Sequence, residues 1–472
     1  MKKSLGWIPK LVVLWTLILF VPALSPAAES TGRVELPKYR MVKFENGMTL
    51  LLLERHQLPL VSFRWVLKSG GSMGDPEGHE GLASLTSQLL RKGTATRTAD
   101  QISEALDFVG ANFNSRSAQE YSMGSAEFLK KDLNLAADLL SDMLLHPSFP
   151  PDEVDKMIKQ EIDSIKEDKA VPQRVIQYYF DGLLFGNHPY GRPLGGTETS
   201  LPRITRDEIV NFYKAHFVPN EMILAVAGDF SASELEAGLR EKFNSWKSRK
   251  VTTPVVKEAS TVQGRHVLVV DKPDSTQTFF RLGTVGLART NPDWIPVQVV
   301  NTLFGGRFTS LINTALRIQS GLTYGANSFF GSRRTPGSFV ISSFTPNEST
   351  ERALNMTLDT LKAFHEKGIS QEQLQSAKNY IKGQFGPTIE TNDQLAGLIA
   401  ELEFYGLGPE YINSYFEKID AMTLADARRI IETYFPVNNL DFVLIGKASV
   451  IDPVAKKLAN DVKKKSITDP GF

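Results

Sequence analysis

The order of apolar and polar positions predicts strands first and helices afterwards. Residues 39–54 consist of two strand-like runs joined by Glu45-Asn46-Gly47, which is a strong signal for a β-hairpin. Residues 61–68 alternate as a third strand would, and a glycine-rich loop then leads into residues 81–94. Strands followed by helices favour an α+β fold in which helices pack on one face of an antiparallel sheet.

Residues 81–94 predict an amphipathic helix. Leu82, Leu85 and Leu89 recur at helical spacing and form a stripe that we expect to be buried. The opposite face carries the polar residues Ser84, Ser87, Gln88 and Arg91. The pattern alone indicates an ordinary solvated helix face.

The rest of the first half is mostly helical. We expect helices over residues 98–109, 133–145, 152–167, 205–216 and 232–243, two strands within 110–128, a loop at 188–196 and a strand at 222–227.

The second half repeats the first. The offsets of 12 and 23 residues that relate Thr205, Phe217 and Gly228 also relate Thr423, Phe435 and Gly446. Residues 247–264 are polar and aperiodic, which is typical of a linker. We therefore predict two duplicated α+β units, at 29–246 and 265–472, joined by the linker 247–264.

The helix at 81–94 lies in a sequence frame that resembles the metal helix of the pitrilysin/insulinase family of zinc peptidases. The frame is the Gly-Leu-Ala opening and the Lys-Gly-Thr close, and further marks are GANFNSRSAQEYS, the block from HPYGRPLGG to AVAGDF, and LFGGRFTSLINTALRIQSGLTYGANS. The likeness covers about residues 34–450 and implies two such units in a clam-shell arrangement.

The resemblance also places the zinc motif. The family's inverted His-x-x-Glu-His motif falls on Ser84, Ser87 and Gln88, and its third ligand falls on Glu161. Zinc takes imidazole, thiolate or carboxylate ligands, and two hydroxyls and an amide supply none of these. We expect Arg91 to point toward the vacant site, where its charge would oppose a cation. Glu161 is then a vestigial ligand position, and on its own an ordinary helix-surface carboxylate.

No other metal site is evident from local spacing. The seven histidines all lie more than ten residues apart, and His79-Glu80 lacks a second histidine because Ala83 stands in its place. A site assembled from distant residues stays open at this stage.

The second half keeps residues that the family uses on substrate. The resemblance implies that Arg317 and Tyr324 approach the scissile carbonyl, and we expect a helix at 308–319, a cap at Ser320-Gly321 and a strand through Leu322 and Tyr324. Without the motif, Arg317 is a solvated helix residue and Tyr324 a half-buried strand aromatic.

Two further contacts with a peptide are expected. Gly305 and Gly306 form a loop that permits close backbone approach or a flexible entrance, and the resemblance implies a substrate contact there. Asn112 and Phe113 lie on a predicted edge strand that could accept an extended peptide.

Composition narrows the class of protein. Lysine and arginine total 53, as do aspartate and glutamate, so no overall charge favours nucleic acid or anionic membranes. The absence of cysteine excludes disulfides, thiolate zinc sites and cysteine nucleophiles. Residues 1–28 have the basic start, apolar run and small residues of a cleaved signal peptide, which predicts export to the periplasm. A retained anchor helix is the alternative, although the apolar run is shorter than the about 20 residues that span a bilayer.

These observations lead to a hypothesis about function. We expect a non-catalytic subunit that forms a heterodimer with a metal-bearing paralogue, binds no metal itself and handles unfolded peptides, with zinc on the partner and no nucleic acid or membrane contact after signal cleavage. One alternative is a peptide-binding or scaffolding protein with no part in hydrolysis. The other is a zinc peptidase active alone, which requires a metal site that the motifs do not supply.

Overall fold

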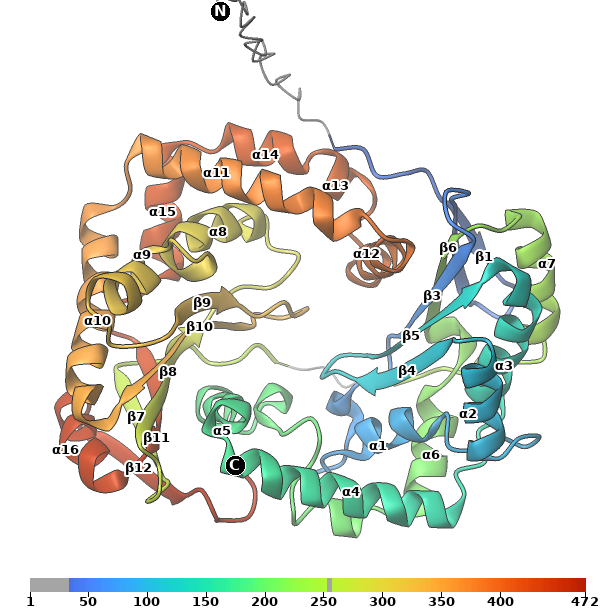
Figure 1. Cartoon of the computed structure of the whole chain (residues 1–472), viewed down its shortest axis with the longest axis horizontal. Coiled ribbons are helices and arrows are strands. Elements are labelled where there is room, and N and C mark those ends of the chain that lie inside the picture. The colour runs from blue at the N-terminus through green and yellow to red at the C-terminus, as the bar shows by residue number, and fades with distance from the viewer. Residues whose placement is uncertain (1–33, 253–256) are drawn as a thin grey trace, which may run out of the picture. The chain divides into compact units, whose positions relative to one another are not determined.

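A computed structural model describes residues 34–252 and 257–472 (Figure 1). The predicted signal peptide lies outside the described residues. The described part of the chain contains no helix that is both long and apolar enough to cross a bilayer.

The first half follows the predicted order of elements. Its strands are β1 (Arg40–Lys43), β2 (Thr49–Glu54), β3 (Leu60–Leu67), β4 (Asn112–Ser117), β5 (Ser122–Leu129) and β6 (Met222–Gly228). Its helices are α1 (Leu82–Leu89), α2 (Ala99–Phe108), α3 (Leu133–Leu145), α4 (Pro151–Ala170), α5 (Pro172–Phe185), α6 (Arg206–His216) and α7 (Ala232–Phe243). The hairpin and the expected helices are confirmed, whereas α5 was not predicted.

The second half has a matching set of strands. These are β7 (Arg265–Asp271), β8 (Gln277–Val285), β9 (Ala326–Phe330), β10 (Ser338–Pro346), β11 (Leu440–Gly446) and β12 (Asp461–Ser466). The helices are α8 (Trp294–Asn301), α9 (Leu311–Asn313), α10 (Thr350–Lys367), α11 (Gln371–Phe385), α12 (Asn392–Tyr405), α13 (Glu410–Asn413), α14 (Tyr415–Ala421), α15 (Leu424–Tyr434) and α16 (Ala448–Leu458).

The two sheets show the duplication directly. Their strand orders are β1-β2-β6-β3-β5-β4 and β12-β7-β11-β8-β10-β9, so β6 and β11 hold equivalent places. Most neighbours are antiparallel, but β6 pairs parallel with β2, and β7 pairs parallel with both β11 and β12. The α+β fold of two duplicated units in a clam-shell arrangement is confirmed, with sheets that are mixed rather than wholly antiparallel.

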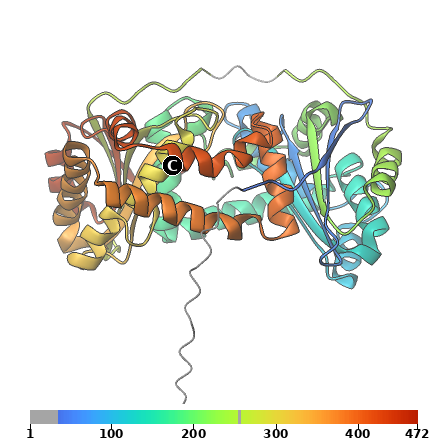
Figure 2. The same cartoon turned by 90° about the horizontal axis from the view of Figure 1, so that it is seen from above.

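Each sheet is covered on both faces. One face packs on helices of its own half, with Leu50, Leu52 and Leu224 in the first core and Val267, Leu282 and Leu444 in the second. The other face receives a helix from the opposite half: α12 packs on β3 and β6, and α5 packs on β8 and β11. In both views α12, drawn in orange, lies beside the strands of the first sheet (Figure 1, Figure 2).

This exchange explains two strands that are buried along their whole length. Every residue of β6 and of β11 is buried, as expected for strands covered on both faces. Polar contacts reinforce the exchange, since the Arg64 guanidinium donates from Nε to a carboxylate oxygen of Asp393 on α12 over 2.7 Å. The sequence prediction of helices on one face of each sheet was therefore incomplete.

Candidate functional site

The N-terminus of helix α1 is capped by a carboxylate from the loop that precedes it. Asp75 accepts hydrogen bonds from the backbone N–H groups of Gly81 at 3.0 Å and Ala83 at 2.9 Å, both at the N-terminus of α1. Burial raises the pKa of Asp75 to about 7, and the two backbone donors oppose that rise only in part. The predicted stripe of Leu82, Leu85 and Leu89 is buried. The sequence therefore identified the buried face of α1 but not its cap.

The raised pKa makes stability depend on pH. Between the ordinary value of 3.8 and the folded value of about 7, the folded chain holds a proton on Asp75 that the unfolded chain has lost. The contribution of Asp75 to stability is thus complete below pH 3.8 and declines as pH rises toward 7, by at most about 1.4 kcal/mol per pH unit. Urea unfolding of the wild type and Asp75→Asn across this range should show a shallower decline in the variant. Identical slopes would contradict the assignment.

The three positions of the zinc motif are filled by a hydrogen-bonded polar network. Ser87 is fully buried, and its Oγ lies 2.7 Å from Oγ of Ser122 on β5. Gln88 donates from Nε2 to Ser84 Oγ over 3.2 Å, and its side chain lies near enough to the Glu161 carboxylate on α4 to influence the pKa of that carboxyl. The expectation of a solvated face was wrong for Ser87, because β5 covers it.

The network does not fit a metal ion. Burial raises the pKa of Glu161, and the nearby Gln88 amide opposes that rise. Among residues 34–252 and 257–472, no group of three or more His, Cys, Asp or Glu side chains could hold a metal ion. A single carboxylate facing an amide and a hydroxyl falls short of the three or four ligands that zinc takes in proteins.

Arg91 has a backbone partner on β4. Its Nη1 donates to the backbone oxygen of Phe113 over 3.2 Å, at the start of β4. The strand β4 is at the edge of the first sheet, as predicted for Asn112 and Phe113. Asn112 is exposed, but the Phe113 side chain is buried in the core, so only the backbone of Phe113 could meet a peptide.

The predicted carbonyl-binding residues, Arg317 and Tyr324, lie on either side of the turn at Gly321. The expected helix at 308–319 begins later, at Leu311, and continues as a π-helix over Thr314–Gln319. Gly321 has φ of 64°, the left-handed conformation predicted for the cap. The expected strand through Leu322 and Tyr324 was wrong because the Thr323 hydroxyl accepts from the Gly325 N–H and makes a local turn, which leaves β9 to begin at Ala326.

A cavity of about 510 Å³ lies next to this turn. Arg317, Gly305, Gly306 and Gly325 line it. Tyr324 is not among the lining residues, but it is 80% exposed. The guanidinium of Arg317 lies 4.8 Å from the centre of the Phe308 ring. Both predicted carbonyl-binding side chains are thus free of strong intramolecular partners in the described part of the chain.

The paired glycines do not form the predicted loop, because Thr302–Gly306 is a π-helix. A Cβ on Gly305 would lie 2.2 Å from Oγ of Ser328, so no larger residue fits there without moving β9, whereas Gly306 is exposed. Close backbone approach is thus seen at Gly305, and contact of either glycine with substrate stays a prediction.

Two other arginines that line the cavity were not predicted from the sequence: Arg281 on β8, and Arg307, which follows Gly306. The only signal for Arg281 is a cation in the middle of the otherwise strand-like run QTFFRLGTV.

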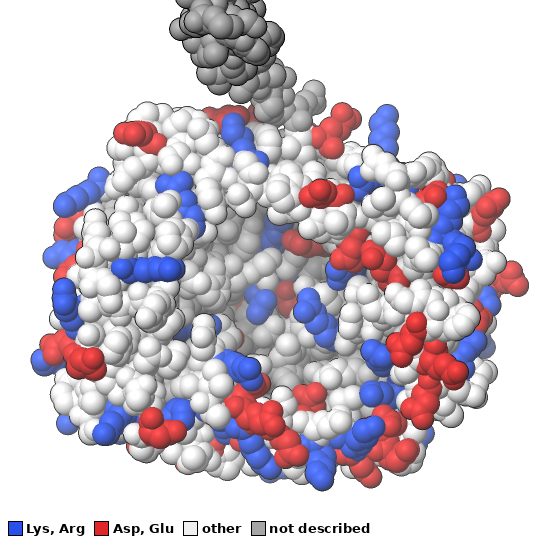
Figure 3. Space-filling view, viewed as in Figure 1, with Lys and Arg blue, Asp and Glu red and all other residues white. Residues whose placement is uncertain are grey.

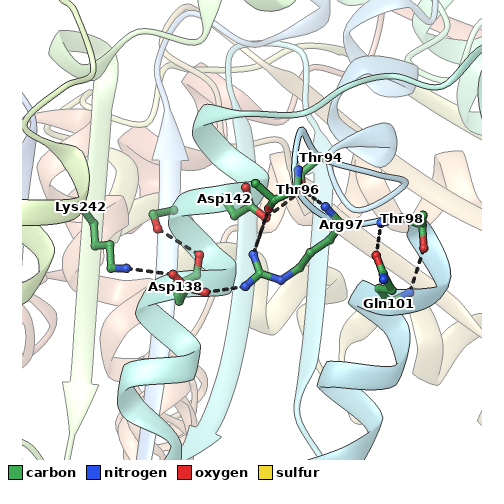
Figure 4. Close-up of polar contacts among 9 residues, drawn as sticks. Thr94, Thr96, Arg97, Thr98, Gln101, Asp138, Asp142 and Lys242 are labelled. Atoms are coloured by element: carbon green, nitrogen blue, oxygen red, sulfur yellow. Dashed lines mark hydrogen bonds and ion pairs between the residues drawn. The ribbon is translucent and has the colours of Figure 1, made fainter.

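The Lys-Gly-Thr close of the α1 frame has a structural role. Asp142 on α3 accepts from the hydroxyls of Thr94 and Thr96, both at 2.8 Å, and pairs with Arg97 at 2.5 Å (Figure 4). Arg97 also pairs with Asp138 at 2.6 Å. These contacts hold the loop after α1 against α3, so the frame serves packing whether or not a metal is bound.

Comparisons with known proteins agree with this geometry. Residues 54–198 match the family model described as "Insulinase (Peptidase family M16)", and residues 203–381 match "Peptidase M16 inactive domain". The chain belongs to the insulinase, or pitrilysin, family. Among relatives in this family, an uncharacterized zinc protease of Mycobacterium leprae is 28% identical over 392 residues, which is 82% of this chain and 86% of the relative. One of Bacillus subtilis is 24% identical over 353 residues, 75% of this chain and 85% of the relative.

Two solved structures share the fold. A peptidase M16 inactive domain from Pseudomonas fluorescens superposes with a TM-score of 0.81 at 23% identity, covering 87% of this chain and 98% of that one. A protease from Helicobacter pylori also gives 0.81, at 19% identity, with 87% and 100% covered. At these identities the likeness establishes the arrangement of the two sheets and leaves the chemistry to the residues described above.

Proposed function

We propose that this chain is a non-catalytic subunit of a heteromeric zinc peptidase of the periplasm. A metal-bearing paralogue would carry out bond cleavage, and this chain would complete the chamber and hold the peptide. Substrates would be unfolded peptides, because contacts to backbone carbonyls and to a sheet edge need an extended chain.

One observation carries the proposal: the two halves are asymmetric. On α1, the positions of the zinc motif hold Ser84, Ser87 and Gln88; Gln88 donates to Ser84, and Ser87 hydrogen-bonds Ser122 on β5. In the second half, Arg317 lines a cavity and Tyr324 is exposed. The metal site has been lost on one side, while donors suited to a peptide carbonyl remain on the other.

The chemistry of those donors is electrostatic. A guanidinium and a phenol can both donate to the oxygen of a peptide carbonyl, and such donors act most strongly when negative charge develops on that oxygen. Neither group transfers the attacking water. The role is therefore one of positioning and charge stabilisation beside a metal held by the partner.

The test is reconstitution with the metal-bearing paralogue. Arg317→Ala or Tyr324→Phe should lower peptide turnover by the mixture about 10²-fold, the usual cost of losing one such donor. Ile318→Ala is a matched control, because Ile318 is exposed on the same helical segment and does not line the cavity. Equal turnover by all of these mixtures would refute the role.

A second candidate function is peptide binding or scaffolding without any part in hydrolysis. The edge strand β4, with Asn112 exposed, favours it because an extended peptide could add there. This function predicts peptide affinity or co-purification with another complex, and turnover that is indifferent to Tyr324→Phe.

A further inference from the structure

The cavity beside Arg317 carries an excess of positive charge. Its polar lining includes Arg281, Arg307 and Arg317, and no Asp or Glu is among the described residues that line it. Figure 3 shows both basic and acidic side chains within the hollow of the face that it presents, so the excess of positive charge belongs to the lining of this cavity and not to the whole hollow. A 510 Å³ space with this lining is large enough for an amino-acid side chain and its neighbours.

Arg281 lies on β8, and two nitrogen atoms of its guanidinium group make no hydrogen bond within the described part of the chain. Strand register sets Arg281 of β8 opposite Ser342 of β10, and Ser342 opposite Asn327 of β9, and all three residues line the cavity. Within the described part of the chain, the buried Nε and Nη1 atoms of Arg281 have no hydrogen-bond partner. Buried guanidinium donors are normally paired, so an acceptor from outside the chain, either water or a ligand that displaces it, would have to serve them.

Arg307 presents a second set of donors. Its Nη1 is fixed to Ser376 by bonds of 3.3 Å to the backbone oxygen and 3.0 Å to Oγ. Its Nε is buried and, among the described residues, has no partner. Arg307 is thus anchored at one end of the guanidinium, while the other donor is available.

The nearest acidic group does not neutralise this cluster. Asp181 on α5 acts on Arg281 through its charge alone, with no hydrogen bond between the two side chains among the described residues. The Asp181 carboxylate instead accepts from Gln177 Nε2 over 2.6 Å. Burial raises the pKa of Asp181 to about 6 and lowers that of Arg281, as expected for groups that lack a close counter-charge.

The alternative is that Arg281 is there only for packing. Its guanidinium carbon lies 5.9 Å from the centre of the Phe329 ring, which is a weak cation–π contact. Such a contact uses the face of the guanidinium and leaves the N–H donors at its edge unsatisfied. Packing therefore does not account for them.

We propose that this cavity binds a carboxylate of an extended peptide, with the Arg281 and Arg307 donors as its partners. A carboxylate offers two oxygens in the planar geometry that arginine pairs best. The strand β9 is the free edge of the second sheet, so a peptide along it could turn one side chain or its C-terminus over this face. The inference rests on the proposed handling of peptides and adds a preference for acidic residues or a free C-terminus.

The experiment measures peptide binding to the full chain by fluorescence anisotropy. Four labelled peptides of one sequence would carry either glutamate or glutamine at a central position, and either a free or an amidated C-terminus. Wild type should bind one carboxylate form at least about tenfold more tightly than its neutral counterpart. The glutamate arm and the C-terminal arm distinguish the two sources of the carboxylate.

Variants assign the preference to the cavity. Arg281→Met should abolish the discrimination, whereas Arg352→Met, at an exposed arginine of a different groove, should leave it intact. Urea unfolding gives an independent readout: Arg281→Met should leave stability unchanged or raise it, because buried donors without partners are removed, and a packing role predicts a loss.

The outcomes separate this inference from the proposed function. Equal affinity of wild type for charged and neutral peptides, or discrimination that survives Arg281→Met, would overturn the carboxylate site while leaving the turnover test of Arg317 and Tyr324 unaffected. Absence of binding by all four peptides would overturn both the site and the proposed handling of peptides.

Discussion

Replacing Ser84 and Gln88 by histidine should give this chain a zinc site. The two positions are one turn apart on α1, and the Glu161 carboxylate of α4 lies close enough to Gln88 for the amide to influence its pKa. The variant would therefore present two imidazoles and one carboxylate, the ligand set of one class of zinc sites. Dialysis against zinc, gel filtration and elemental analysis should show stoichiometric metal in Ser84→His/Gln88→His.

Two control variants test whether zinc binding requires all three ligands. Gln88→His alone offers only one imidazole beside Glu161, and adding Glu161→Gln to the double variant removes the carboxylate, so neither should retain zinc through gel filtration. A folded double variant without zinc would show that α1 and α4 do not hold the ancestral ligand geometry. No hydrolysis is expected from the double variant, because Ser87 cannot act as the general base.

Restoring the base should be harder than restoring the ligands. Ser87 is fully buried against Ser122, which in turn donates to the backbone oxygen of Gly70 over 2.6 Å. A glutamate there would place a longer, charged side chain in a filled and hydrogen-bonded position. The loss of the motif has thus been accompanied by packing that opposes its return.

Truncating Asp142 should destabilise the first half strongly. Its side chain is 8% exposed and bonds Thr94, Thr96 and Arg97 at once. Asp142→Ala leaves two hydroxyls and a guanidinium without this acceptor, which should cost about 2–4 kcal/mol of the free energy of unfolding. The measurement is urea unfolding followed by circular dichroism.

The matched control is Asp138, which bonds the same arginine from one turn away. Its side chain is 39% exposed, so Asp138→Ala should cost about 1 kcal/mol or less. Equal losses for the two variants would mean that the loop after α1 does not depend on Asp142 as described.

Local patterns predicted much of the fold. The hairpin turn at Asn46-Gly47, the leucine stripe of α1 and the helix α2 depend on neighbours close in sequence, and each was found where expected. The exchange of α5 and α12 depends on packing between halves, which no local period records. The continuous apolar sequence of β6 was a signal of this exchange, because a strand covered on one face only would alternate between apolar and polar residues.

The candidate site was predictable in position and less so in detail. The family frame located Ser84, Gln88, Glu161 and Arg317, but the surroundings of each side chain come from distant segments. Ser87 is buried because β5 crosses over it, and Tyr324 lies outside a strand because a threonine hydroxyl makes a local turn. The sequence did not identify Arg281 as a site residue, because a single arginine in a strand does not indicate which groups its side chain faces.

The zinc content of the isolated wild-type chain tests the central claim most directly. The full chain would be equilibrated with excess zinc, separated from free metal by gel filtration and analysed for metal per polypeptide. The account predicts far less than stoichiometric zinc, because a lone Glu161 beside an amide and a hydroxyl cannot retain the ion. One tightly held zinc per chain would contradict it.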